Sequence, residues 1–225
     1  MADTEPDFET LLGMFRTEIE GLTDAQLDWD DPAEEWSGWS IRRQISHVAL
    51  VYFFWVSKTW GRIIWPGAPP ANSVVFSKAG VYDRRLVEEK FWRLEDLLPK
   101  FEEALMLAAR VAREKSPEER RALTLERTFK EGLMMGKTDL PVFRFWAYAS
   151  TFHLDGLDQS AEDETVFTFS LTGMIRHLYW EALVHLRTIQ RLKAAQGLAP
   201  AVQIPREGYL MDPFFWGPGD EPRMI

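Results

Sequence analysis

The segment HLYWEALVH, from His177 to His185, carries two of the chain's four histidines, with Glu181 midway between them. Residues four apart on an α-helix lie one above the other, so a helix here would place these three side chains in one row. The neighbours Met174 and Leu178 are apolar, which puts the row beside a buried stripe. A buried charge without a partner is costly, so Glu181 should be paired. Imidazole and carboxylate groups arranged in this way could bind a divalent metal.

Spacing limits which of these residues could share one ion. His177 and His185 are separated by about 12 Å of helix rise, too far for bonds of about 2 Å to a common ion. The pairs Glu181 with His185 and His177 with Glu181 both remain. A third ligand is expected from another helix, and His47 is the natural candidate. The structural alternative stays open, because a histidine on an apolar helix face is more often a hydrogen-bonded core residue than a ligand, and ExxxH is not a specific motif.

Composition excludes several classes of protein. The chain has 225 residues, ten tryptophans and fifteen phenylalanines, enough for one sizeable core. It has no cysteine, so disulfides, thiolate zinc sites and iron–sulfur clusters are excluded. The net charge of −9 argues against non-specific nucleic-acid binding. No apolar run is long enough for a membrane span, and the acidic N-terminus does not resemble a signal peptide, so we expect no membrane association and a cytoplasmic location.

Four long helices are predicted from apolar residues that recur at three- and four-residue steps. The second helix begins after Ser40, a suitable N-cap, and carries His47. The third should kink or break near Pro99. The last begins after Ser170 and ends before Gly197. The predicted helices span residues 8–22, 41–64, 83–115 and 171–196.

The remaining segments are shorter. Ser116 and Pro117 predict the start of a further helix, and the segment DLPVFRFWAYASTF could be helix or strand. The segment ETVFTFS is predicted to be extended. The tail from Ala201 is rich in Pro, Gly and aromatic residues, and we expect it to pack on the domain or on a partner chain. These elements predict an all-α protein with one bundle domain, residues 1–200, followed by an aromatic C-terminal tail, residues 201–225.

Two segments carry a resemblance to a known family. WSIRRQISHVALV resembles the second-helix motif of the DinB/YfiT-like family, in which a tryptophan and a Ser/Thr cap precede a ligand histidine. FTFSLTGMIRHLYWEALVHLRTIQRLKAAQGLAP is similar to that family's last helix. The resemblance covers residues 8–200 and implies an up-down-down-up four-helix bundle with a metal held by three histidines. It implies His47 and His185 as ligands, and it puts Glu181 where the family has a histidine. His177 matches an upstream family histidine that is usually not a ligand.

The resemblance also implies a function. Two histidines and one carboxylate leave coordination positions open for water or substrate. We expect Zn or Ni first, although Fe or Mn would also suit these ligands. A bound metal could activate water or a low-molecular-weight thiol, so we expect a metal-dependent enzyme that is S-transferase-like or hydrolase-like, acts on a small molecule and forms a homodimer. The alternative is a non-catalytic helical bundle, used for binding or dimerisation, with a degenerate metal site.

Two other groups of residues are weaker candidates. His153 stands near Asp155 and Asp158 and could belong to a cation-binding loop, but we expect a solvated turn there. Trp60, Trp65 and the aromatic residues at 214–216 could line an apolar pocket. For these we expect buried packing or a dimer contact instead.

Overall fold

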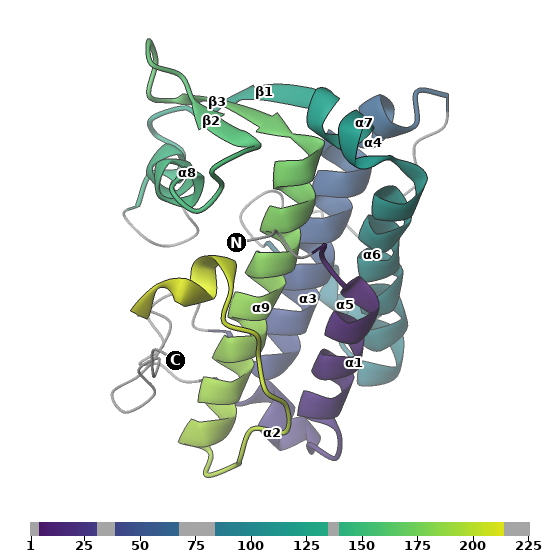
Figure 1. The fold of residues 1–225 in the computed structure, drawn as a ribbon. Helices are drawn as coiled ribbons and strands as arrows, with labels where there is room; N and C mark the ends of the chain where they lie inside the picture. Colours follow the sequence, from purple (N-terminus) through teal and green to yellow (C-terminus); the bar gives the residue numbers. More distant parts are fainter. Residues whose placement is uncertain (1–4, 31–38, 68–83, 135–139, 214–225) are drawn as a thin grey trace.

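The computed structural model describes residues 5–30, 39–67, 84–134 and 140–213. Four long helices form the body of the described part (Figure 1). Helix α3 packs against α6 and α9, and α1 packs against the same two helices. The chain is therefore mostly helical, as predicted. These four helices are α1 (Phe8–Ile19), α3 (Ile41–Tyr52), α6 (Leu94–Glu114) and α9 (Leu171–Ala195).

Helix α1 begins as its sequence predicts and ends earlier. The side chain of Asp7 accepts a hydrogen bond from the backbone N–H of Thr10 at 2.9 Å, which caps the first turn. The helix ends at Ile19, because Gly21 adopts a positive φ of 74° that a helix cannot continue. A short helix, α2 (Asp24–Asp28), follows between the ranges of the first two predicted helices.

The predicted helix over residues 41–64 is present but is not uniform. Helix α3 continues directly into a π-helical segment, η1 (Phe53–Thr59), and then, beyond Trp60, into α4 (Gly61–Ile64). Phe53, Trp55 and Trp60 are buried along this path. The prediction of buried packing is therefore confirmed for Trp60, whereas the aromatic residues at 214–216 lie outside the described residues.

The third predicted helix differs in where it is interrupted. Its described part contains two helices, α5 (Glu88–Phe91) and α6, separated at Trp92 and Arg93, and residues 84–87 before them are not helical. The predicted break at Pro99 is wrong, because α6 runs through that residue. Pro99 lies in the second turn of α6. Its missing N–H removes one helical hydrogen bond, the one to the carbonyl of Glu95. The burial of α6 residues such as Phe101 outweighs that loss.

The prediction of an all-α fold is not exact, because the described residues include a three-stranded antiparallel sheet in the order β1-β3-β2. Strand β3 coincides with the segment that was predicted to be extended. Strand β1 follows directly after α7, the helix that begins at the Ser116 cap. The segment left open between helix and strand is helix α8. These elements are β1 (Thr124–Thr128), β2 (Leu157–Gln159), β3 (Val166–Ser170), α7 (Pro117–Ala122) and α8 (Val142–Ser150).

The sheet lies at the end of the molecule where α9 begins, because β3 leads straight into that helix (Figure 1). The hydroxyl of Ser170 accepts a hydrogen bond from the N–H of Gly173 at 3.0 Å and caps α9. Gly173 also meets the backbone of Gly156 so closely that a side chain at Gly173 would overlap it. The start of α9 is thus fixed both by a cap and by direct backbone contact.

The described part of the tail, residues 201–213, packs on the helices. The buried carboxylate of Glu18 accepts hydrogen bonds from the N–H groups of Ala201 and Val202, each at 3.1 Å, and pairs with Lys193 at 2.5 Å. A short 3₁₀ helix, η2 (Gly208–Met211), then packs on α9 and buries Tyr209. The tail is therefore held at two places.

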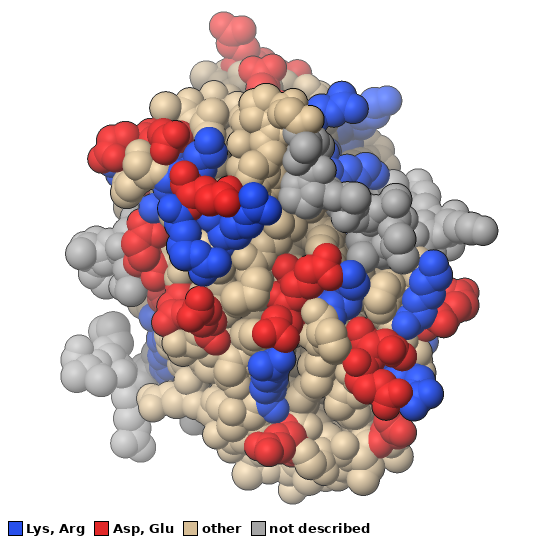
Figure 2. Space-filling model, turned by 90° about the vertical axis from the view of Figure 1, so that its right-hand side faces the viewer, with Lys and Arg blue, Asp and Glu red and all other residues tan. Residues whose placement is uncertain are grey.

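Acidic and basic side chains are interspersed on the face that Figure 2 presents. Two ion pairs join α1 to α6: Arg16 with Glu102 at 2.8 Å, and Arg113 with Glu9 at 3.3 Å. These exposed pairs each contribute little to stability. Within the described ranges, no helix combines the length and the apolar character needed to cross a lipid bilayer.

Candidate metal centre

His47 lies in the middle of α3 and is completely buried. Its Nδ1 atom lies 2.6 Å from the backbone carbonyl oxygen of Arg84. A carbonyl oxygen only accepts, so Nδ1 carries the proton and Nε2 carries a lone pair. Nε2 is buried and has no hydrogen-bond partner among the described residues. His47 therefore presents a bare nitrogen lone pair to the protein interior.

The ring of His185, on α9, is also oriented by a hydrogen bond at its Nδ1 atom. It is completely buried, and its Nδ1 lies 2.6 Å from Oε1 of Gln44, a residue of α3. The side-chain amide of Gln44 donates through Nε2 to the carbonyl of Trp39 at 3.3 Å, which fixes Oε1 as the acceptor for His185. The Nε2 atom of His185 is therefore unprotonated. Hydrogen bonds that orient a ligand through its second nitrogen are typical of metal-binding histidines.

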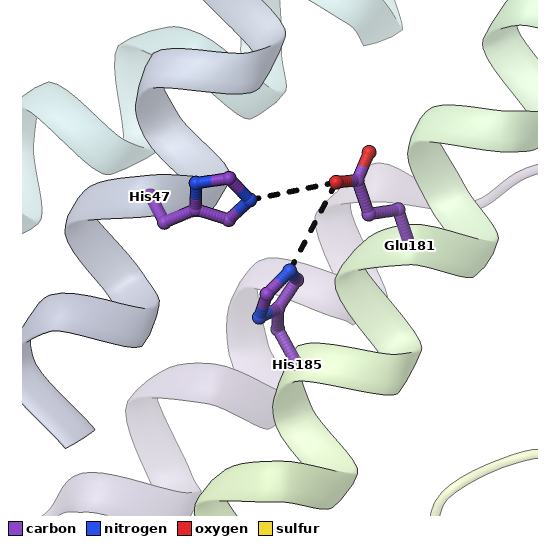
Figure 3. Close-up of side chains that lie close together, drawn as sticks. All are labelled: His47, Glu181 and His185. Carbon is purple, nitrogen blue, oxygen red and sulfur yellow. Dashed lines mark ion pairs between the residues drawn. The ribbon is translucent and has the colours of Figure 1, made fainter. Parts of the chain in front are cut away.

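Glu181 completes the group. It lies one turn before His185 on α9, and its side chain is 14% exposed. Its Oε1 atom lies 3.5 Å from Nε2 of His47 and 3.9 Å from Nε2 of His185, and all three side chains point toward one another (Figure 3). The three ligand atoms lie within 4.8 Å of one another. Tetrahedral coordination with bonds of about 2.1 Å separates ligand atoms by about 3.4 Å, so small side-chain movements suffice to surround an ion.

The charge state of the group also suits a divalent cation. Burial lowers the pKa of His47, and burial together with His47 holds the pKa of His185 well below its usual value. Burial acts to raise the pKa of Glu181, but His177 and His47 outweigh it, so the pKa lies well below the usual value of a glutamate. At neutral pH the group is one carboxylate with two neutral imidazoles, the state that metal binding requires.

His177 lies near this group without joining it. Its Nε2 is 3.1 Å from Oε2 of Glu181, whereas the two histidines of the group face Oε1. Spacing alone allowed either His177 or His185 to share an ion with Glu181. In the structure, Glu181, His185 and His47 form the group that could hold a metal. His177 instead makes a second contact to the carboxylate.

The prediction of a solvated turn holds for Asp155, which is exposed, but is wrong for His153 itself. The side chain is buried, and its Nε2 lies 2.9 Å from the hydroxyl of Tyr209. Tyr209 lies 56 residues further along the chain, and only the packing of the tail brings the two together. The turn residues Asp155 and Gly156 follow directly, which is why the local sequence predicts solvent exposure.

Two partners of the group were missed by sequence reasoning. Gln44 is one helical turn before His47, and that spacing was the available signal. Arg84 had no such signal, because it lies outside any helix and has a left-handed φ of 48° that is costly for a residue with a side chain. Its guanidinium lies 5.9 Å from the ring centre of Trp39. Burial lowers the pKa of Arg84, while the charge of Glu181 acts to raise it.

Fold and site together define a mostly helical protein with a small antiparallel sheet and a buried His-Glu-His group that could hold a metal ion. No protein-family model matches the chain, and neither does any curated protein or any solved structure.

Proposed function

We propose that this protein is a metal-dependent enzyme of the DinB/YfiT-like kind, in which α1, α3, α6 and α9 form an up-down-down-up bundle around one divalent cation. The ligands are His47, Glu181 and His185. The observation that carries the proposal is the Nε2 atom of His47, which is buried, has no hydrogen-bond partner among the described residues and lies 3.5 Å from a carboxylate oxygen. An orphaned buried nitrogen is costly, and a cation at this position would satisfy it.

The second partners of the ligands support the same proposal. A carbonyl oxygen holds the His47 ring, and an amide oxygen holds the His185 ring, so both rings are oriented before any ion enters. Such second contacts are typical of metal sites and raise the basicity of the ligand nitrogen. A structural histidine does not need its second nitrogen to be bare and aimed at a carboxylate. The pattern therefore favours metal binding over simple core packing.

The donor set limits the choice of metal and reaction. Two imidazoles and one carboxylate suit Zn or Ni first, and Fe or Mn as well. A divalent cation held here would lower the pKa of a water molecule or small thiol at an open coordination position. Glu181 supplies the negative charge, and its side chain is 14% exposed. We infer an S-transferase-like reaction with a low-molecular-weight thiol, with hydrolysis as the second reaction class.

A parallel activity assay tests this function. The metal-loaded protein is offered a small thiol with an aryl halide electrophile in one assay and an aryl ester with water in the other. We expect turnover in at least one assay, lost on chelation and in Glu181→Gln, whose neutral amide is a poor ligand. The matched control is Glu102→Gln on α6, which removes a carboxylate that pairs only on the surface with Arg16. Bound metal without turnover in either assay would contradict an enzyme of these classes and would support the non-catalytic alternative.

A further inference from the structure

A chain of buried polar groups runs from the metal site to the C-terminal tail. The Nε2 atom of His177 lies 3.1 Å from Oε2 of Glu181, and its Nδ1 lies 2.6 Å from the hydroxyl of Tyr209. The same hydroxyl lies 2.9 Å from Nε2 of His153. His177, Tyr209 and His153 are all buried. Four side chains from α9, the tail and the segment after α8 thus meet in one connected path.

The protons in this path can be assigned. A carboxylate only accepts, so the nitrogen of His177 that faces Oε2 of Glu181 is the protonated one. In the neutral ring the other nitrogen, Nδ1, accepts, and the hydroxyl of Tyr209 donates to it. That hydroxyl has one proton, so it accepts from Nε2–H of His153. The reverse order would place a lone pair of His177 against the ionised carboxylate, which is unfavourable.

The hydroxyl of Tyr209 is held in place by its surroundings. Gly208 packs so tightly on the ring of Trp180 that a side chain there would overlap it. The Trp180 ring also lies 5.6 Å from the ring of Tyr209 and 4.7 Å from that of His153, centre to centre. Further back, Glu18 binds the backbone where the tail begins. The tail is therefore anchored at two places before the tyrosine.

We propose that Tyr209 is a positioning residue of the metal site: through His177 it fixes the carboxylate of Glu181 so that Oε1 faces His47 and His185. Oε2 is buried and makes no hydrogen bond among the described residues, and the ring of His177, at 3.1 Å, is its ion-pair contact. With the chain intact, one carboxylate oxygen is held by the protein and the other is left for the ion. The inference rests on the proposed metal site, and it makes the C-terminal tail part of that site.

The first test needs no metal. Nitrogen-15 chemical shifts of the imidazole rings in the metal-free protein report which nitrogen of each histidine carries the proton. We expect the Nε2–H form for His177 and the Nδ1–H form for His47 and His185. Tyr209→Phe should shift the Nδ1 resonance of His177, which loses its hydrogen-bond donor, while leaving the Nε2–H form of His177 and the ring of His47 unchanged. An Nδ1–H form of His177 in the parent would overturn the proposed direction of the chain, whether or not the protein binds metal.

The second test measures metal affinity with Co²⁺ in competition with a chromophoric chelator. Loss of a second contact to a ligand typically lowers metal affinity by about 10- to 100-fold, and we expect this for Tyr209→Phe, with a shift of the Co²⁺ absorption bands. The matched control is Tyr148→Phe. It removes the same group from a hydrogen bond to Asp212, which also lies in the tail, and that hydrogen bond involves neither His177 nor a proposed ligand. We expect its affinity and spectrum to match the parent's.

A double-variant comparison separates the chain from a general effect of loosening the tail. In a His177→Leu background the chain is already broken, so adding Tyr209→Phe should change affinity by less than about twofold. An equal loss in both backgrounds, or no loss in Tyr209→Phe alone, would overturn the inference while leaving the metal site intact. A parent that binds no Co²⁺ would contradict the proposed function itself, and the tautomers measured without metal would then decide on the chain separately.

Discussion

Replacing Gly208 by alanine should destabilise the protein, because two independent features of the structure oppose a side chain there. The residue has a left-handed φ of 54°, which costs an alanine about 1 kcal/mol relative to glycine. A Cβ atom would also overlap the ring of Trp180, and overpacking of this kind costs about 1–3 kcal/mol. Together these effects predict a loss of about 2–4 kcal/mol in the free energy of unfolding.

Urea denaturation followed by tryptophan fluorescence measures this loss. With a slope of about 2 kcal/mol per molar urea, the midpoint should fall by about 1–2 M at unchanged slope. The matched control is Gly13→Ala. Gly13 lies exposed within α1, and a Cβ there meets nothing within 4 Å. That variant should be more stable by about 0.5–1 kcal/mol, because alanine is the better helix former. Midpoints that move in the same direction for both variants would refute the reasoning.

Three further predictions concern stability. Burial lowers the pKa of His153 to about 2, so below pH ~6.5 this side chain is neutral in the folded protein but protonated in the unfolded chain. The free energy of unfolding should therefore fall by ~1.4 kcal/mol per pH unit more in the parent than in His153→Gln. Unfolding of both proteins at pH 7 and pH 5 measures this difference. Lys193→Met leaves the buried carboxylate of Glu18 without its cation and should cost about 3–5 kcal/mol in denaturant titrations; an unchanged midpoint would contradict that pairing. Ser170→Ala removes the cap of α9 and should cost about 1 kcal/mol by the same measurement, whereas Ser170→Thr, which keeps an acceptor, should cost less.

Much of the helical structure was predictable, because it rests on local signals. The last helix was predicted over residues 171–196 and is observed as Leu171–Ala195, since Ser170 caps it and Gly197 ends it with a φ of 75°. The meeting of His47 with Glu181 and His185 was predicted from four-residue spacing on one helix and from the resemblance that placed the second helix beside it. Those signals do not depend on distant contacts, and so a sequence can reveal them.

The sheet and the polar chain depend on distant contacts and were harder to predict. Strand β1 reads TLERT, a polar segment whose extended form is stabilised by pairing with β3 rather than by its own composition. His153 is buried only because Tyr209 arrives from the tail. Arg84 reaches His47 through a left-handed backbone conformation that nothing in its neighbours signals. In each case, packing overrides the local preference of the chain.

The proposed function requires His47, Glu181 and His185 to bind a metal. Elemental analysis of untagged protein, incubated with Zn²⁺, Ni²⁺ or Fe²⁺ and then dialysed, measures this. We expect about one equivalent of metal in the parent and in Glu102→Gln, a control that removes a surface carboxylate outside the ligand set, and none in His47→Ala or His185→Ala. Metal absent from the parent under all three conditions, or retained in both alanine variants, would contradict the account.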